Sequence, residues 1–91
     1  MELGLKGLKL FITAGASGIG RQIVESFLSE GANVATCDID HTALAELRAA
    51  HPSVSAYHCD VSDSPAIQDL IKNTADEMGG LDCLVNNAGI A

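Results

Sequence analysis

The sequence predicts an α/β fold in which helices cover both faces of a doubly wound parallel sheet. Four short apolar runs alternate with three amphipathic segments of helical periodicity along the 91 residues. The apolar runs are continuous, which is typical of strands buried on both faces. A glycine-rich turn joins the first apolar run to the first amphipathic segment. The predicted order is therefore β-α-β-α-β-α-β, and right-handed crossovers give the spatial strand order 3-2-1-4.

The first predicted strand is Lys9–Thr13, and the first predicted helix follows at Gly18–Glu30. Apolar residues recur in this helix at the spacing of one buried face. They are Ile19, Ile23, Val24, Phe27 and Leu28. Gly31 is expected to end the helix, because glycine readily adopts the left-handed conformation found after a helix C-terminus.

A second strand is predicted at Asn33–Cys37, followed by a second helix. Either Asp40 or Thr42 can cap this helix, because both side chains can accept a hydrogen bond from a free N–H of the first turn. The helix should stop before Pro52, since the residue preceding a proline disfavours the helical conformation. Its apolar positions are Leu44 and Leu47.

The last predicted elements are a third strand with its exit at Ser55–Val61, a third helix, and a fourth strand at Leu81–Asn86. Asp63 or Ser64 can cap the third helix. The glycine pair at residues 79–80 should end it. Its inner stripe consists of Ile67, Leu70, Ile71, Thr74, Ala75 and Met78.

Composition excludes several classes of partner. The net charge of −7 argues against binding to nucleic acid or to an anionic membrane surface. No apolar run approaches the roughly 20 residues of a membrane span, and the N-terminus lacks a signal-peptide pattern, so we expect a cytoplasmic protein. The cysteines and histidines lack the spacing of a metal or redox motif, and we interpret them as reduced core thiols and as surface or strand-exit histidines. These residues are Cys37, Cys59, Cys83, His41, His51 and His58.

The strongest functional signal is the segment TAGASGIG at residues 13–20, which leaves the first strand and opens the first helix. Glycine allows a phosphate to approach the backbone, and a helix N-terminus offers free N–H groups and the positive end of the helix dipole. We therefore interpret this segment as a pyrophosphate-binding loop. The alternative is an ordinary tight turn rich in glycine. The candidate ligand-binding residues here are Gly15, Ser17, Gly18, Ile19 and Gly20.

A carboxylate stands at the end of the second predicted strand. In a dinucleotide site, Asp38 there would accept hydrogen bonds from the ribose hydroxyls and repel a 2′-phosphate. Ile39 follows, so no basic residue is placed to receive the extra phosphate of NADP. These two residues predict NAD as the cofactor. The alternative role for Asp38 is a turn-forming or helix-capping acid.

Taken together, these motifs resemble the N-terminal part of the short-chain dehydrogenase/reductase family, which has a Rossmann fold. The family pattern T-G-x-x-x-G-x-G is matched except that Ala14 replaces the first glycine. The segment CDV at 59–61 resembles the pair whose carboxylate and backbone contact adenine, which implies that Asp60 and Val61 bind it; Asp60 could instead cap a turn. The segment NNAG at 86–89 matches the family signature that flanks the cofactor. That match adds Asn87, Ala88 and Gly89 to the candidate site.

The resemblance covers essentially all 91 residues and implies an NAD-dependent oxidoreductase that transfers hydride between nicotinamide and a small alcohol or carbonyl substrate, with homo-oligomers expected. The family's catalytic Tyr-x-x-x-Lys is absent: Tyr57 is the single tyrosine, and Val61 stands where the lysine would be. We therefore assign no catalytic residue. Residues 1–91 are interpreted as one NAD-binding unit, truncated before the catalytic segment and inactive alone.

Two other functions are compatible with parts of the sequence. The chain could act independently as a nucleotide-binding or partner-binding module without catalysis. A reading frame that continues into a Tyr-x-x-x-Lys would distinguish the enzyme from this module. A methyltransferase that uses S-adenosylmethionine shares the glycine-rich loop and the ribose-binding acid, but the NNAG segment is not expected in it.

Overall fold

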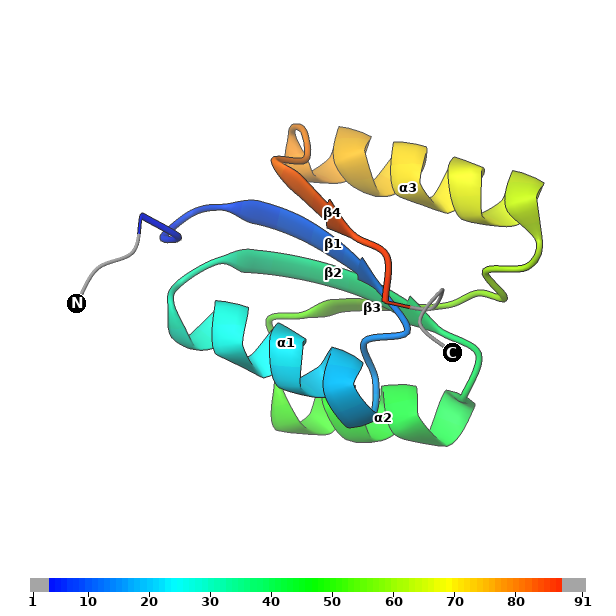
Figure 1. Cartoon of the computed structure of the whole chain (residues 1–91), viewed down its shortest axis with the longest axis horizontal. Helices are drawn as coiled ribbons and strands as arrows, with labels where there is room; N and C mark the ends of the chain where they lie inside the picture. Colours follow the sequence, from blue (N-terminus) through cyan, green and yellow to red (C-terminus); the bar gives the residue numbers. More distant parts are fainter. Residues whose placement is uncertain (1–3, 88–91) are drawn as a thin grey trace.

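The computed structural model describes residues 4–87 and contains the predicted alternation of strands and helices (Figure 1). The four strands are parallel and hydrogen-bonded in the order β3-β2-β1-β4, which confirms the predicted doubly wound α/β topology. The elements are β1 (Lys9–Thr13), α1 (Gly18–Ser29), β2 (Asn33–Asp38), α2 (His41–Ala50), β3 (Ser55–His58), α3 (Ser64–Met78) and β4 (Cys83–Val85).

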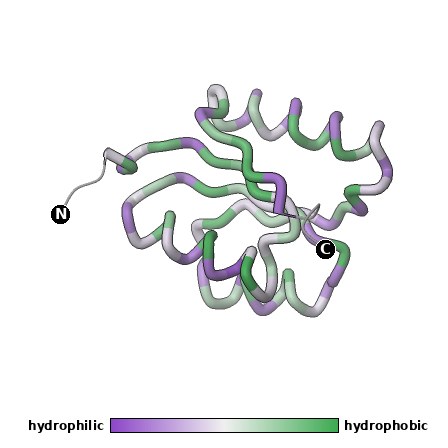
Figure 2. The backbone as a smooth tube through the Cα atoms, viewed as in Figure 1, coloured by the Kyte–Doolittle hydropathy of each residue, from purple (hydrophilic) through white to green (hydrophobic). Residues whose placement is uncertain are grey.

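Helices cover both faces of the sheet, with α1 and α2 on one side and α3 on the other (Figure 1). Successive side chains of a strand point to opposite faces. Leu10 and Ile12 of β1 therefore pack with α1 and α2, whereas Phe11 packs with α3. All three are fully buried, and the strands form the hydrophobic centre of the molecule (Figure 2). None of the helices in residues 4–87 has both the length and the apolar character to cross a membrane.

The predicted apolar stripe of α1 is wrong at one position. Ile19 is 66% exposed, because it lies in the first turn of the helix, where it lines a pocket and is not covered by the sheet. The other four residues of the stripe are buried or half-buried against the core: Ile23, Val24, Phe27 and Leu28. The helix ends at Ser29, one residue earlier than predicted, and Gly31 follows with a left-handed φ of 84°.

The structure decides between the alternative helix caps. Asp40 caps α2 by accepting a hydrogen bond of 3.1 Å from the Ala43 N–H. Asp63 caps α3 in the same way, with the Ala66 N–H at 3.2 Å. Gly79 ends α3 as predicted, in the left-handed conformation. Each carboxylate satisfies an N–H of the first turn that has no partner within its own helix.

The third strand and its exit lie where they were predicted, whereas the fourth strand is shorter than predicted. Strand β3 ends at His58, so Cys59 lies just outside it and the CDV segment forms the strand exit. Strand β4 keeps only three residues, because Asp82 already diverges from regular pairing. Its carboxylate accepts the Lys9 N–H at 2.8 Å, in place of a strand carbonyl, while its own N–H donates to the Lys9 carbonyl.

Candidate dinucleotide site

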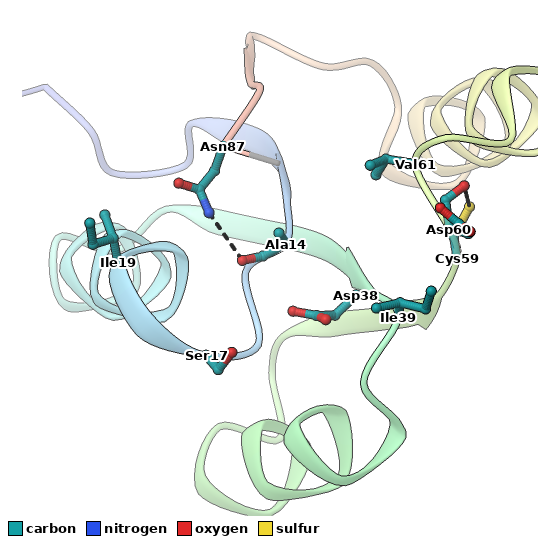
Figure 3. Close-up of a pocket in the computed structure, with 9 residues that line it drawn as sticks. All are labelled: Ala14, Ser17, Ile19, Asp38, Ile39, Cys59, Asp60, Val61 and Asn87. Atoms are coloured by element: carbon teal, nitrogen blue, oxygen red, sulfur yellow. Dashed lines mark hydrogen bonds between the residues drawn. The ribbon is translucent and has the colours of Figure 1, made fainter. Parts of the chain in front are cut away.

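A pocket of about 420 Å³ lies at the carboxyl ends of the strands (Figure 3). This edge of a doubly wound sheet is where such folds bind ligands, and the volume is in the range of small-molecule sites. The lining residues come from the loop after β1, the end of β2, the exit of β3 and the segment after β4. They are Ala14, Ser17, Ile19, Asp38, Ile39, Cys59, Asp60, Val61 and Asn87.

One wall of the pocket is the start of α1. The first helical hydrogen bond runs from the Arg21 N–H to the Ser17 carbonyl. Within residues 4–87, the N–H groups of residues 18–20 therefore have no backbone acceptor. Ser17 is the N-cap residue, yet its hydroxyl makes no capping bond. This end of the pocket combines free donors with the positive end of a helix dipole and can hold an anionic group.

The glycines shape this loop. Gly18 has a left-handed φ of 59°, which favours glycine. A Cβ at Gly20 would overlap the Ala14 carbonyl and lie 2.6 Å from Asn87 Nδ2. That amide nitrogen donates to the same Ala14 carbonyl at 3.2 Å, so Gly20 allows α1, the loop and the segment after β4 to meet (Figure 3).

Asp38 is buried at the end of β2 and faces the loop across the pocket (Figure 3). One carboxylate oxygen accepts the Ala16 N–H at 3.2 Å, and the other accepts the Asp40 N–H at 3.1 Å. Asp38 therefore braces the turns on both sides, as its alternative interpretation predicted. Each oxygen keeps further lone pairs for a ligand hydroxyl. Ile39, beside it, is 60% exposed.

The exit of β3 forms the third wall. One oxygen of Asp60 accepts hydrogen bonds from the Ser62 hydroxyl at 2.7 Å and the Ser62 N–H at 2.9 Å. The bond from the Ser62 hydroxyl, and to a smaller extent the bond from the Ser62 N–H, lowers the pKa of Asp60, so the carboxylate is charged at neutral pH. Asp60 thus caps a turn and also lines the pocket. Burial raises the pKa of the neighbouring Cys59 thiol, which remains uncharged.

The structure brings most of the sequence-predicted residues together. Gly15, Gly18 and Gly20 shape the loop without lining the pocket, and Ala88 and Gly89 lie outside the described residues. Sequence reasoning did not assign Ala14 and Cys59 to the site, although each sits directly inside a recognised motif. The predicted residues that line the pocket are Ser17, Ile19, Asp38, Ile39, Asp60, Val61 and Asn87.

The histidines were predicted to be surface or strand-exit residues. His41 and His58 are exposed, and their rings stack with centroids 3.8 Å apart. The Nε2 atom of His58 also lies 3.0 Å from the Ile39 carbonyl oxygen, so the pair supports the backbone beside the pocket. His51 differs, because it is half-buried and its Nε2 lies 2.8 Å from a carboxylate oxygen of Glu25 on α1.

The sequence model of the short chain dehydrogenase family matches residues 9–91, which include the whole loop–strand arrangement around the pocket. The chain belongs to the short-chain dehydrogenase family. Two relatives illustrate the similarity. A short chain dehydrogenase/reductase, dpchG, of Colletotrichum higginsianum is 38% identical over 96% of this chain and 34% of its own length. The 2,5-dichloro-2,5-cyclohexadiene-1,4-diol dehydrogenase of Sphingobium indicum is 40% identical over 94% of this chain and 35% of its own length.

The fold is also that of solved members of the short-chain dehydrogenase family. A short chain dehydrogenase from Mycobacterium smegmatis superposes with a TM-score of 0.83 and 38% identity, over 91% of this chain and 37% of that one. The present chain thus spans about a third of the length of the short-chain dehydrogenases that it matches.

Proposed function

We propose that residues 1–91 form the NAD(H)-binding unit of a cytoplasmic short-chain oxidoreductase. The complete enzyme would transfer hydride between nicotinamide and a small alcohol or carbonyl substrate, and it would assemble as a homo-oligomer. One observation carries the proposal. The same pocket contains the free N–H groups at the start of α1 and, on its other side, the Asp38 carboxylate.

The two ends of the pocket suit different parts of NAD. The start of α1 would hold the diphosphate through the N–H groups of residues 18–20 and the Ser17 hydroxyl. Asp38 would accept the ribose hydroxyls. Asp60 and Val61 would contact the adenine, and Asn87, with Ala88 and Gly89, would flank the rest of the cofactor. The bound cofactor would supply the hydride acceptor or donor.

Asp38 also supports the preference for NAD over NADP. Among residues 4–87, no lysine or arginine lines the pocket. A 2′-phosphate would therefore meet the negative charge of Asp38 without a compensating cation. Like charges a few ångströms apart cost on the order of 1 kcal/mol or more where they are partly desolvated.

Cofactor titration tests this preference. Wild type should bind NAD more tightly than NADP by at least about fivefold, the equivalent of that repulsion. Asp38→Ala should narrow the difference and Asp38→Arg should narrow it further. Both variants also remove the bonds to Ala16 and Asp40, so their stability should be measured in parallel. Asp40→Ala is the matched control, because it removes an acid that does not line the pocket. Equal or tighter binding of NADP by wild type would refute the preference.

We also propose that the 91-residue polypeptide has no dehydrogenase activity by itself. Its single tyrosine, Tyr57, donates to Glu77 of α3 and does not line the pocket. No Tyr-x-x-x-Lys acid is therefore present to protonate a developing alkoxide. Nicotinamide absorbance should stay constant with any alcohol or ketone, and reproducible turnover by the purified polypeptide would show the proposal to be wrong.

A non-catalytic module remains the second candidate, since the pocket could serve nucleotide binding alone. The module could bind a nucleotide or a partner, but only the enzyme requires a continuation of the reading frame that encodes Tyr-x-x-x-Lys. Sequencing the transcript beyond the codon for residue 91 therefore distinguishes them.

A further inference from the structure

Thr36, in the middle of β2, carries a buried hydroxyl that is bonded on two sides. It accepts the Gly15 N–H at 3.0 Å and donates to the Ile12 carbonyl at 2.6 Å. The residue is fully buried and does not line the pocket. A single side chain of β2 therefore connects the last part of β1 to the first turn of the glycine-rich loop.

Gly15 and Thr36 fit each other closely. A Cβ at Gly15 would overlap the Thr36 hydroxyl and lie 2.9 Å from Val24 Cγ2. The hydroxyl thus occupies the space that glycine leaves free. Without it, the Gly15 N–H would keep only the Cys37 carbonyl, at 3.4 Å. A buried donor that loses its better partner is costly, and the loop would shift to recover one.

We propose that Thr36 is a positioning residue for the diphosphate end of the pocket. This inference rests on the proposed dinucleotide-binding function. Thr36 holds Gly15, which lies two residues before the N-cap Ser17. The hydroxyl thereby fixes where the free N–H groups of residues 18–20 point. It sets affinity for a diphosphate without touching the ligand.

The role predicts a selective effect on ligand binding. ADP-ribose uses both ends of the pocket, whereas adenosine uses only the end formed by Asp38 and Asp60. Thr36→Val keeps the side-chain shape and removes the hydroxyl. It should weaken ADP-ribose binding by about tenfold, which is the effect expected from the loss of one buried hydrogen bond. The affinity for adenosine should stay within about twofold of the wild-type value. Thr36→Ser restores the hydroxyl and should recover most of the ADP-ribose affinity.

Isothermal titration calorimetry of the full 91-residue chain and its variants with ADP-ribose and with adenosine provides the test. Circular dichroism checks that each variant is folded. Cys37→Ala is the matched control, because Cys37 is the next buried residue of β2 and faces α3. Burial raises the pKa of its thiol to about 11, so the control removes no charge at neutral pH. It should lower stability without changing the ratio of the two affinities.

The outcomes separate this inference from the function on which it rests. If wild type fails to bind ADP-ribose, the dinucleotide-binding function itself is rejected, and the role of Thr36 with it. If wild type binds but Thr36→Val keeps the wild-type affinity ratio, only the role of Thr36 is overturned. An equal loss of affinity for ADP-ribose and for adenosine in Thr36→Val would likewise overturn the role of Thr36. Failure of Thr36→Ser to recover the affinity for ADP-ribose would also overturn it. If Thr36→Val does not fold, Thr36→Ala takes its place and the same ratios decide.

Discussion

At the scale of single residues, Ala14 shows most directly how the loop is constrained. Its φ of 57° is left-handed, and it is the one non-glycine residue with such a backbone in the described part of the chain. The family pattern has glycine at this position. A left-handed alanine costs roughly 1–2 kcal/mol in local strain. Asn87 holds the Ala14 carbonyl, which helps the loop to keep this conformation.

We predict that Ala14→Gly stabilises the chain by about 0.5–1 kcal/mol, because relief of the strain exceeds the greater unfolded-state entropy of glycine. Urea denaturation monitored by circular dichroism measures the change. Ala16→Gly, two residues later, is the matched control: Ala16 is buried without a left-handed φ, so this change should be destabilising. Stabilisation by both variants, or by neither, would contradict the assignment of strain to Ala14.

At the scale of elements, α1 and α2 are joined by a polar contact beside their apolar packing. Glu25 of α1 accepts a hydrogen bond from His51, the C-cap residue of α2, and also pairs with Arg21 at 3.5 Å. The bond from His51, followed by the smaller effect of Arg21, lowers the pKa of Glu25 from its ordinary value of 4.5. The contact therefore links the packing of the two helices to pH.

The sign of the pH dependence follows from this lowered pKa. A carboxyl group whose pKa is lower in the folded than in the unfolded state stabilises the fold above its unfolded-state pKa. The stabilisation is lost as the pH falls through the folded-state pKa. Glu25→Gln should therefore lower Tm at neutral pH, and its difference from wild type should shrink below pH 4.5.

Thermal unfolding across this pH range measures the effect. Glu46→Gln on the exposed face of α2 is the control, because Glu46 makes no hydrogen bond or ion pair within residues 4–87. If the difference in Tm between Glu25→Gln and wild type stays constant with pH, the contact between Glu25 and His51 does not make stability depend on pH.

At the scale of the whole molecule, the two edges of the described sheet differ. At β3, the Arg48 guanidinium donates to the outward Ala56 carbonyl at 2.6 Å and so blocks further strand pairing. Strand β4 pairs only with β1 within the described residues, and Leu84 at its centre is 53% exposed. An unpaired apolar edge strand is a template for association with another chain.

We therefore predict that the 91-residue chain self-associates through β4 in micromolar solution. Leu84→Lys should reduce association, because a charge on the edge opposes burial against a second strand. Sedimentation velocity measures the change. Ala45→Lys adds the same charge to the exposed face of α2 and should leave association unchanged. A stable wild-type monomer would show that the β4 edge does not drive association.

The sequence predicted the fold more completely than the site. Strand and helix order followed from hydrophobic periodicity, which is local in sequence. The errors lie where periodicity ends: Ile19 continues the helical pattern of α1 but projects into the pocket, and β4 is shortened by the Asp82 carboxylate. Motifs located seven residues that line the pocket, because spacing after a strand fixes their place at the sheet edge.

The sequence by itself determined the family, the strand order and the position of a pocket at the carboxyl ends of the strands. Only the tertiary structure revealed the three side chains that brace the loop, because each contact joins residues far apart in sequence. These side chains are Thr36, Asp38 and Asn87, and they hold Gly15, Ala16 and Ala14 across separations of 21, 22 and 73 residues. The order of neighbouring residues in the sequence determines which turns, helices and strands the chain can form. Which side chain satisfies each buried backbone group depends on the packing of distant strands.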